Sequence, residues 1–162
     1  MEYLSTISSV DFFSPDLLVF YKLMLATLLG LALGFERTIA GKMAGMRTYA
    51  LMALGSCLLI IVGLSVDLDY LGKTNFDPMR LAAGIITGVG FICGGLVIFT
   101  DKQLLGLTTA AGMWVSVGIG IAVGFGLFNI AIFTTIITLV VFSVLWHLEV
   151  FIQKVSKELP RD

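Results

Sequence analysis

Charged residues are scarce in this sequence of 162 residues. Asp, Glu, Lys and Arg together make up only 13% of the chain, whereas hydrophobic residues make up 58%. Soluble domains carry about a quarter charged residues, so this composition excludes an ordinary soluble fold. Lipid is therefore the expected solvent for much of the chain. The fold class that we predict is all-α, a polytopic bundle of transmembrane helices.

The sequence also lacks the residue clusters that support catalysis or metal binding. It has one histidine, two cysteines and a net charge of −1 without any basic tract. No second His and no Cys lies at ligand spacing from His147, which disfavours zinc, and nucleic acid is not an expected partner. Cys57 and Cys93 lie inside apolar runs and are expected to be buried. We expect no enzyme activity, no catalytic residues, no metal and no cofactor.

Five apolar runs are long enough to cross a bilayer, which takes about 20 residues of helix. No Asp, Glu, Lys or Arg occurs between Lys102 and Glu149, a stretch that fits two helices joined by a turn at residues 124–129. The predicted helices are residues 17–35, 49–66, 81–99, 104–123 and 128–151. The fourth helix has two possible interpretations, a full crossing of the membrane and a re-entrant segment. Residues 1–152 then form a transmembrane domain and residues 153–162 a short cytoplasmic tail.

The distribution of Lys and Arg predicts the orientation, because cytoplasmic loops are enriched in these residues. The N-terminal segment has no Lys or Arg before Lys22, and aspartates dominate the connection between the second and third runs. The other side collects Arg37, Lys42, Arg47, Lys102, Lys154, Lys157 and Arg161. We expect the N-terminus outside the cell and the C-terminus in the cytoplasm.

Two predicted helices on the outer side begin with the same signal, an N-cap residue followed by proline. These are Ser14-Pro15 and Asp77-Pro78. Arg80 lies three residues after Asp77 and so shares a helix face with it, which makes the two an outer-side motif. Capping is a sufficient role for Asp77, so no metal is assigned to it.

Glycine, by contrast, is abundant. The chain has 18 glycines, and pairs four residues apart recur, among them Gly30/Gly34 and Gly90/Gly94. One interpretation is close helix packing through small residues, and the other is a polar cavity lined by glycines of the third and fourth helices. The residues assigned to this packing or cavity surface are Gly88, Gly90, Gly94, Gly95 and Trp114, with the tryptophan expected to fill a gap between helices.

A weak internal repeat indicates two tandem hairpins, although chance similarity stays open as well. Gly45-Met-Arg-Thr-Tyr-Ala50 and Gly106-Leu-Thr-Thr-Ala-Ala111 each open a helix at the predicted cytoplasmic face. The positive ends of both helix dipoles would then lie together with Arg47, Thr48, Thr108 and Thr109. Such a patch would hold an anionic group or one end of a partner. The alternative is an interfacial anchor at Arg47 and threonines bonded to their own helices.

Glu36 and Arg37 end the first helix at the membrane edge, where ionisable groups usually face protein or water. We expect Glu36 to form an ion pair with Arg47, and a carboxylate that handles protons or cations is the alternative. The candidate functional polar cluster is therefore Glu36, Arg37, Arg47, Thr48, Thr108 and Thr109.

Three ordered stretches carry a family resemblance. The first is Gly34-Phe-Glu-Arg37 with Gly41 and Ala44-Gly-Met-Arg-Thr48, and the second is Asp77-Pro-Met-Arg80 with Ala82-Ala83, Gly88-Val-Gly-Phe91 and Gly94-Gly95. The third is Gly106-Leu-Thr-Thr-Ala-Ala111 with Trp114 and small residues up to Gly126. In these stretches the chain resembles the MgtC/SapB family of bacterial inner-membrane proteins. It looks like the shorter SapB-like members, because little chain follows the last helix for the soluble C-terminal domain of the MgtC branch.

The resemblance implies a setting more than a mechanism. The family is associated with growth at low magnesium, acid tolerance and survival inside host cells, and MgtC is thought to restrain the membrane ATP synthase. Family members often have a glutamine where this chain has Gly84, and a small residue followed by Ala-Gly where it has Cys93-Gly94-Gly95. A polar role of that glutamine therefore does not transfer.

Two functional hypotheses follow. The leading one is a non-enzymatic inner-membrane protein that modulates a membrane partner complex in magnesium and acid stress, through helix–helix contact and as a homo-oligomer such as a dimer. The alternative is a small homo-oligomeric transporter or channel for protons or metal cations, which would use Glu36 and the glycine-lined surface.

Overall fold

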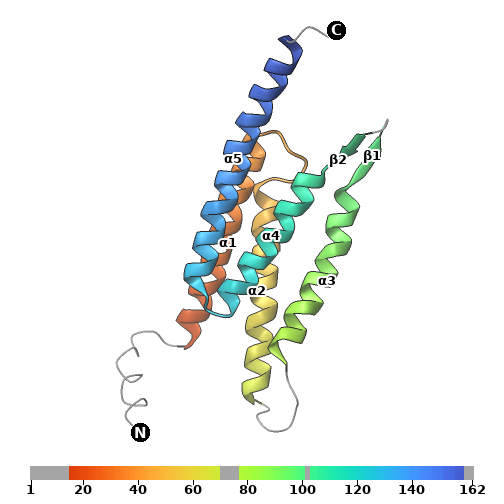
Figure 1. Cartoon of the computed structure of the whole chain (residues 1–162). Coiled ribbons are helices and arrows are strands. Elements are labelled where there is room, and N and C mark those ends of the chain that lie inside the picture. The colour runs from red at the N-terminus through yellow and green to blue at the C-terminus, as the bar shows by residue number, and fades with distance from the viewer. Residues whose placement is uncertain (1–14, 70–76, 101–102, 159–162) are drawn as a thin grey trace.

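The computed structural model describes residues 15–69, 77–100 and 103–158. Its elements in chain order are α1 (Pro15–Ile39), α2 (Met46–Asp69), α3 (Pro78–Leu96), β1 (Ile98–Thr100), β2 (Gln103–Leu105), α4 (Leu107–Gly124) and α5 (Phe128–Glu158). All five helices are long and apolar enough to cross a membrane, which confirms the predicted fold class. The start of α1 and the end of α5 lie at opposite ends of the bundle (Figure 1).

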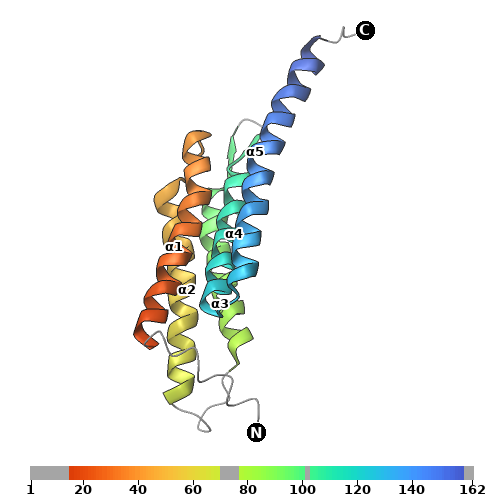
Figure 2. The same cartoon turned by 90° about the vertical axis from the view of Figure 1, so that its left-hand side faces the viewer.

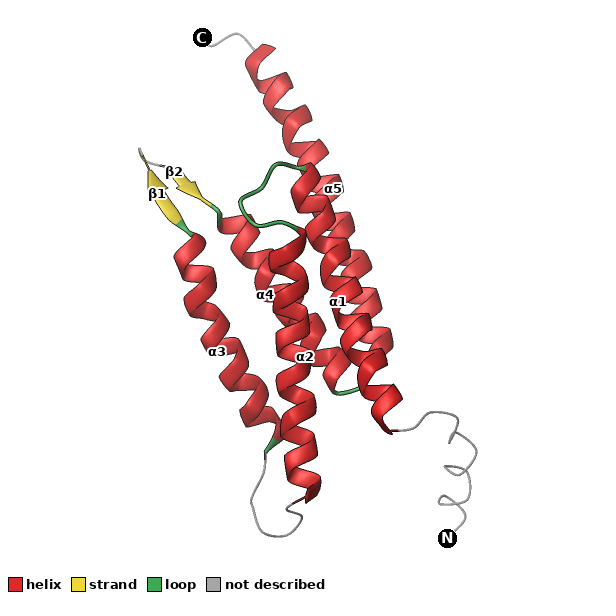
Figure 3. Cartoon of the chain, turned by 180° about the vertical axis from the view of Figure 1, so that it is seen from behind, coloured by secondary structure: helices red, strands yellow, loops and turns green. Residues whose placement is uncertain are grey.

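Helix α4 lies at the centre of the bundle. It packs against α1, α2, α3 and α5, and 56% of its span is buried, against 17% of the span of α3. Helices α1 and α5 lie on one side of α2 and α4, and α3 lies on the other side (Figure 3). The backbone of α4 approaches α2 closely, since a Cβ at Gly120 or Gly124 would collide with α2. Small residues thus permit a close interface between α2 and α4.

The connection between α3 and α4 differs from the prediction. The third helix ends at Leu96 rather than at residue 99, and the fourth begins at Leu107 rather than at residue 104, as one uninterrupted helix. Between them β1 and β2 form an antiparallel hairpin, in which Ile98 pairs with Leu105. The β-branched and aromatic residues of β1 favour a strand over a helix. Gly106 then turns the chain into α4 with a φ of +84°, which glycine adopts without strain.

The helix ends show which local signals were sufficient. Asp77 is the N-cap of α3 and accepts a hydrogen bond from the Met79 amide at 2.9 Å, with Pro78 at the first helical position, as predicted. The other predicted N-cap, Ser14, lies outside the described residues. Lys22 of α1 donates from Nζ to the carbonyl of Gly124 at 2.9 Å and so places a cation at the C-terminal end of α4.

Helix α5 is longer than predicted. It continues to Glu158 rather than to residue 151, so most of the predicted tail is helical. Its last turns project beyond the other four helices (Figure 2).

Candidate functional site

The predicted polar cluster is divided between two cavities at the end of the bundle where α1 ends and α2 and α4 begin. Arg47 and Thr48 line a cavity of about 270 Å³ beside the start of α2. Arg37 and Thr108 line another, of about 220 Å³, together with Lys42 and residues of α5. Thr109 is buried in the interior. The single polar patch, one of the two interpretations of these residues, is therefore not formed.

Arg37 is buried although it carries a charge. Its side chain is 2% exposed, and the guanidinium carbon lies 3.7 Å from the centre of the Phe142 ring of α5. Its Nε donates to the carboxylate of Glu36. An aromatic face and a carboxylate thus stabilise one cation between α1 and α5. The expected pair of Glu36 with Arg47 is wrong, because Arg47 lies at the separate cavity beside α2.

Glu36 also lines a groove between α1 and α5. The groove has a volume of about 640 Å³ and largely apolar walls, from Ala32, Phe35, Ile39 and Ala40 of α1 and Leu139, Ser143 and Trp146 of α5. The Glu36 side chain is 19% exposed there. Trp146 lines both this groove and the cavity of Arg37, so the two spaces adjoin.

Hydrogen bonds from side chains to carbonyl groups join α2 to α4, and we call this interface the α2–α4 seam. The Tyr49 hydroxyl donates to the carbonyl of Thr109 at 3.1 Å, and Ser116 donates to the carbonyl of Tyr49 at 2.9 Å. Ser56 donates to the carbonyl of Val117 at 3.0 Å. Sequence reasoning missed this seam. Its only signal was a few hydroxyl groups inside otherwise apolar helices, where such groups require partners.

Helix α3 has open space around its glycines. A Cβ added at any of the glycines that we call the α3 glycine surface would meet no atom within 4 Å: Gly84, Gly88, Gly90, Gly94 and Gly95. Phe91, between them, is 87% exposed. The buried residues of α3 are Ala82, Val89 and Cys93. Close packing, one of the two interpretations of these glycines, is therefore not formed with the described residues of this chain, and Trp114, which is 49% exposed, fills no gap between the described helices.

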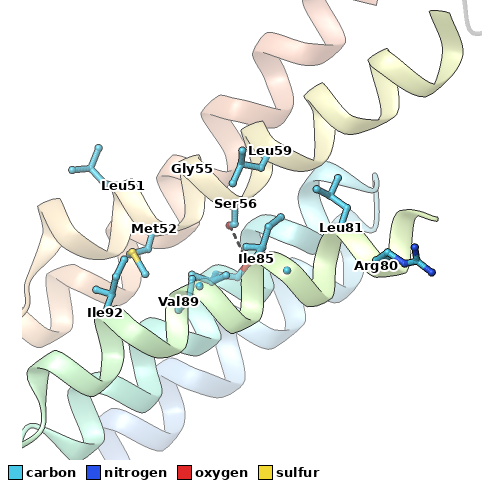
Figure 4. A pocket seen from close by; sticks show the side chains of 13 residues that line it. Leu51, Met52, Gly55, Ser56, Leu59, Arg80, Leu81, Ile85, Val89 and Ile92 are labelled. Atoms are coloured by element: carbon cyan, nitrogen blue, oxygen red, sulfur yellow. Dashed lines mark hydrogen bonds between the residues drawn. The ribbon is translucent and has the colours of Figure 1, made fainter. Parts of the chain in front are cut away.

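A cavity of about 520 Å³ separates α3 from α2 (Figure 4). Gly88, which was assigned to the packing or cavity surface, lines it together with Gly84, but most of its walls are apolar side chains such as Leu51, Leu59 and Ile85, unlike the polar cavity of the second interpretation. Arg80 lies at one end of the cavity (Figure 4). The outer-side motif is thus divided between two roles, since Asp77 caps the helix and Arg80 lines the cavity.

No metal site is evident in the part of the chain that the structure describes. No three His, Cys, Asp or Glu side chains are grouped there to hold an ion. Cys57 and Cys93 are free and buried, as predicted. The Cys93 thiol donates to the carbonyl of Ala110 at 3.4 Å and so joins α3 to α4.

These features define a small multi-span helical membrane protein. The MgtC family model matches residues 23–151, and the chain belongs to this family. The chain is 40% identical over 129 residues to "Putative magnesium transporter YhiD" of Escherichia coli K12, a match that covers 78% of this chain and 60% of YhiD. It is 37% identical to Protein SapB of Bacillus subtilis, over 73% of this chain and 51% of SapB. It is 39% identical to Protein MgtC of Salmonella typhimurium LT2, over 72% of this chain and 48% of MgtC.

The chain spans about half to three fifths of the length of these relatives. No solved structure matches it. The matched residues include both polar cavities, the α2–α4 seam and the α3 glycine surface. The comparisons thus confirm the family resemblance and the membrane setting.

Proposed function

We propose that this protein acts without catalysis, by helix–helix contact with a partner complex in the bacterial inner membrane, and that α3 is its contact surface. The observation that carries the proposal is the open space around the five glycines of the α3 glycine surface. Burial of apolar side chains drives no association in lipid, so helices associate where small residues let backbones approach. A partner helix would find that approach on α3.

The weak attachment of α3 to its own chain supports this role. Its span is 17% buried, the same fraction as that of α5, and in addition an apolar cavity separates α3 from α2. Glycine is also a poor helix former, at a cost of about 1 kcal/mol relative to alanine. Close contact with a partner offsets that cost, whereas the described chain offers α3 no close contact at these glycines.

The biological setting is inferred from the family. The relatives include proteins named for MgtC and for magnesium transport, so we assign the contact to adaptation to low magnesium and acid. Arg37, Lys42 and Arg47 all lie at the end of the bundle where α1 ends, and we assign this end to the cytoplasm, with the N-terminus outside. Reporter fusions after residues 42 and 73 test the orientation, and cytoplasmic activity at residue 73 would contradict it.

The contact is tested with the double variant Gly90→Leu/Gly94→Leu. Its side chains enter open space, so the monomer should insert and keep its thermal stability, while the crosslinked complex recovered from membranes should fall at least tenfold. Gly118→Leu is the matched control, because Gly118 of α4 also has no atom within 4 Å of an added Cβ. Co-expression of two tagged forms shows in the same material whether the partner is a second copy. Undiminished recovery of the complex would count against α3.

Cation transport is the second candidate, favoured by the name of YhiD and by the partly exposed carboxylate of Glu36. The transport hypothesis combined Glu36 of α1 with the glycine-lined surface of α3. These two parts are separated in the structure, because α2 and α4 lie between α1 and α3 (Figure 3). Purified protein in sealed liposomes decides between the candidates. Proton or magnesium flux that is lost in Glu36→Gln would establish transport. Liposomes that show no flux under any of the ion gradients would support the helix-contact role instead.

A further inference from the structure

The cavity of about 220 Å³ at the ends of α1 and α5 has one cationic and one apolar side. Arg37, Lys42 and Thr108 form the polar side. Val141, Phe142, Leu145 and Trp146 of α5 form the apolar side. Drug-sized ligands occupy cavities of about 300 Å³ or more, so this space suits a smaller group.

The buried guanidinium of Arg37 points to the charge of that group. Glu36 engages only its Nε, and no described residue accepts a hydrogen bond from its two terminal amino groups. Every fully enclosed polar side-chain atom of the described residues has a partner, so these amino groups reach the surface of the cavity that Arg37 lines. A buried charge with free donors is costly unless an anion accepts from them.

Two further features make the same side of the cavity positive. Lys42 supplies a second cation beside Arg37. The carboxylate of Glu36, in the adjoining groove, balances only one of these two positive charges, so an excess of one positive charge remains at the described side chains. The first intrahelical bond of α4 runs from the Ala110 amide to the Gly106 carbonyl, and Gly106 provides no side-chain cap. The preceding amide groups of α4, including that of Thr108, are therefore free to bind an anion.

The apolar side indicates which anion this is. The cavity adjoins the groove of about 640 Å³ between α1 and α5, through Trp146, which lines both. A free phosphate ion would gain nothing from that groove, whereas a lipid would place an acyl chain along it. A phosphodiester with one negative charge also balances the excess of one positive charge.

We propose that this cavity binds the phosphate group of an anionic phospholipid, with an acyl chain in the α1–α5 groove. The site is independent of the α3 glycine surface, which lies on the other side of α2 and α4 (Figure 3). Lipid binding would hold the end of α5 against α1, whether or not α3 recruits a partner.

The test is native mass spectrometry of the full chain in detergent, titrated with phosphatidylglycerol and with phosphatidylcholine of the same acyl chains. We expect phosphatidylglycerol to bind about tenfold more tightly than phosphatidylcholine. A tenfold difference in affinity corresponds to the contribution of about one hydrogen bond to a charged group. Lys42→Gln should abolish that preference and Lys42→Arg should keep it. Arg47→Gln is the matched control, since Arg47 lies at the same end but lines the other cavity. Circular dichroism verifies that each variant is folded.

Two results would overturn the proposal. The first is equal binding of the two lipids by the unaltered chain. The second is an equal loss of the preference for phosphatidylglycerol in Lys42→Gln and Arg47→Gln, which would show that the cavity is not the binding site. Inorganic phosphate is the soluble probe. If it displaces phosphatidylglycerol while phosphatidylglycerol itself shows no advantage over phosphatidylcholine, the anion is a free phosphate and the lipid assignment is wrong.

Discussion

Two pairs of glycines with the same spacing have opposite surroundings. Gly30 and Gly34 of α1 lie against α2, and a Cβ at Gly34 would approach the Met46 Cα to 2.5 Å. Gly90 and Gly94 of α3 have no atom within 4 Å of an added Cβ. The spacing identifies a helix surface suited to close approach. It does not say whether the partner belongs to the same chain.

The difference extends from the glycines to the hydrogen bonds around them. Helices α1, α2 and α4 form a closely packed unit, held by the α2–α4 seam and by Lys22 at the end of α4. Helix α3 is joined to that unit by Ala82, Val89 and Cys93 and by the β1–β2 hairpin. We infer that the unit carries the stability of the fold and that α3 is available for association.

The largest effect should come from Gly34→Ala. The added methyl group would meet the backbone at Gly45 and Met46, where α2 begins, and backbone cannot rotate away as a side chain would. Overpacking of this kind costs about 2 kcal/mol, so the free energy of unfolding in detergent should fall by that amount. Unchanged stability would mean that α1 and α2 can move apart without cost, which would contradict the inference that α1, α2 and α4 form a closely packed unit.

The hydroxyl groups of the α2–α4 seam should contribute less. Ser56→Ala and Ser116→Ala each remove one interhelical hydrogen bond, at 3.0 Å and 2.9 Å. Such bonds contribute about 0.6 kcal/mol in membrane proteins, because the unfolded helices also find partners. Unfolding of the single and double variants measures this contribution. Thr87→Ala is the control, since Thr87 of α3 bonds only to its own helix. A larger loss in Thr87→Ala than in Ser56→Ala would contradict the division between the two regions.

A similar or slightly smaller effect is expected at Lys22. Its ammonium group satisfies the Gly124 carbonyl and lies at the negative end of the α4 dipole. Lys22→Gln should lower the free energy of unfolding by about 0.5 kcal/mol. Lys22→Arg should retain most of the stability, and an equal loss in both variants would show that the shape of lysine matters rather than its charge.

The packed unit was only partly predictable from the sequence. The five helices follow from apolar length, because a bilayer of fixed thickness demands about 20 apolar residues from each. The N-cap at Asp77 follows from its own neighbours in the chain. The burial of Arg37 does not, because it depends on Phe142 of α5, which the sequence cannot place above it. The β1–β2 hairpin was missed since its apolar residues look like the end of a helix.

The glycines show the same limit. Gly34 and Gly94 are alike in spacing and in apolar surroundings along the chain, and the sequence offered close packing as one interpretation of both. What separates them is which helix lies beside each, a property of the whole arrangement. Hydrogen bonds within the seam were hidden for the same reason, because Tyr49 and Thr109 lie on different helices.

The smallest effect is expected at Gly94→Ala, the counterpart of Gly34→Ala on α3. The same methyl group enters open space, so the free energy of unfolding should change by less than about 0.5 kcal/mol. Alanine also favours the helix more than glycine does, which offsets any small loss. The measurement is the unfolding titration used for Gly34→Ala, on monomeric protein in detergent. If Gly94→Ala destabilised the monomer as much as Gly34→Ala, Gly94 would have to pack closely against another helix of the same chain. The contrast between α3 and the packed unit of α1, α2 and α4 would then be wrong.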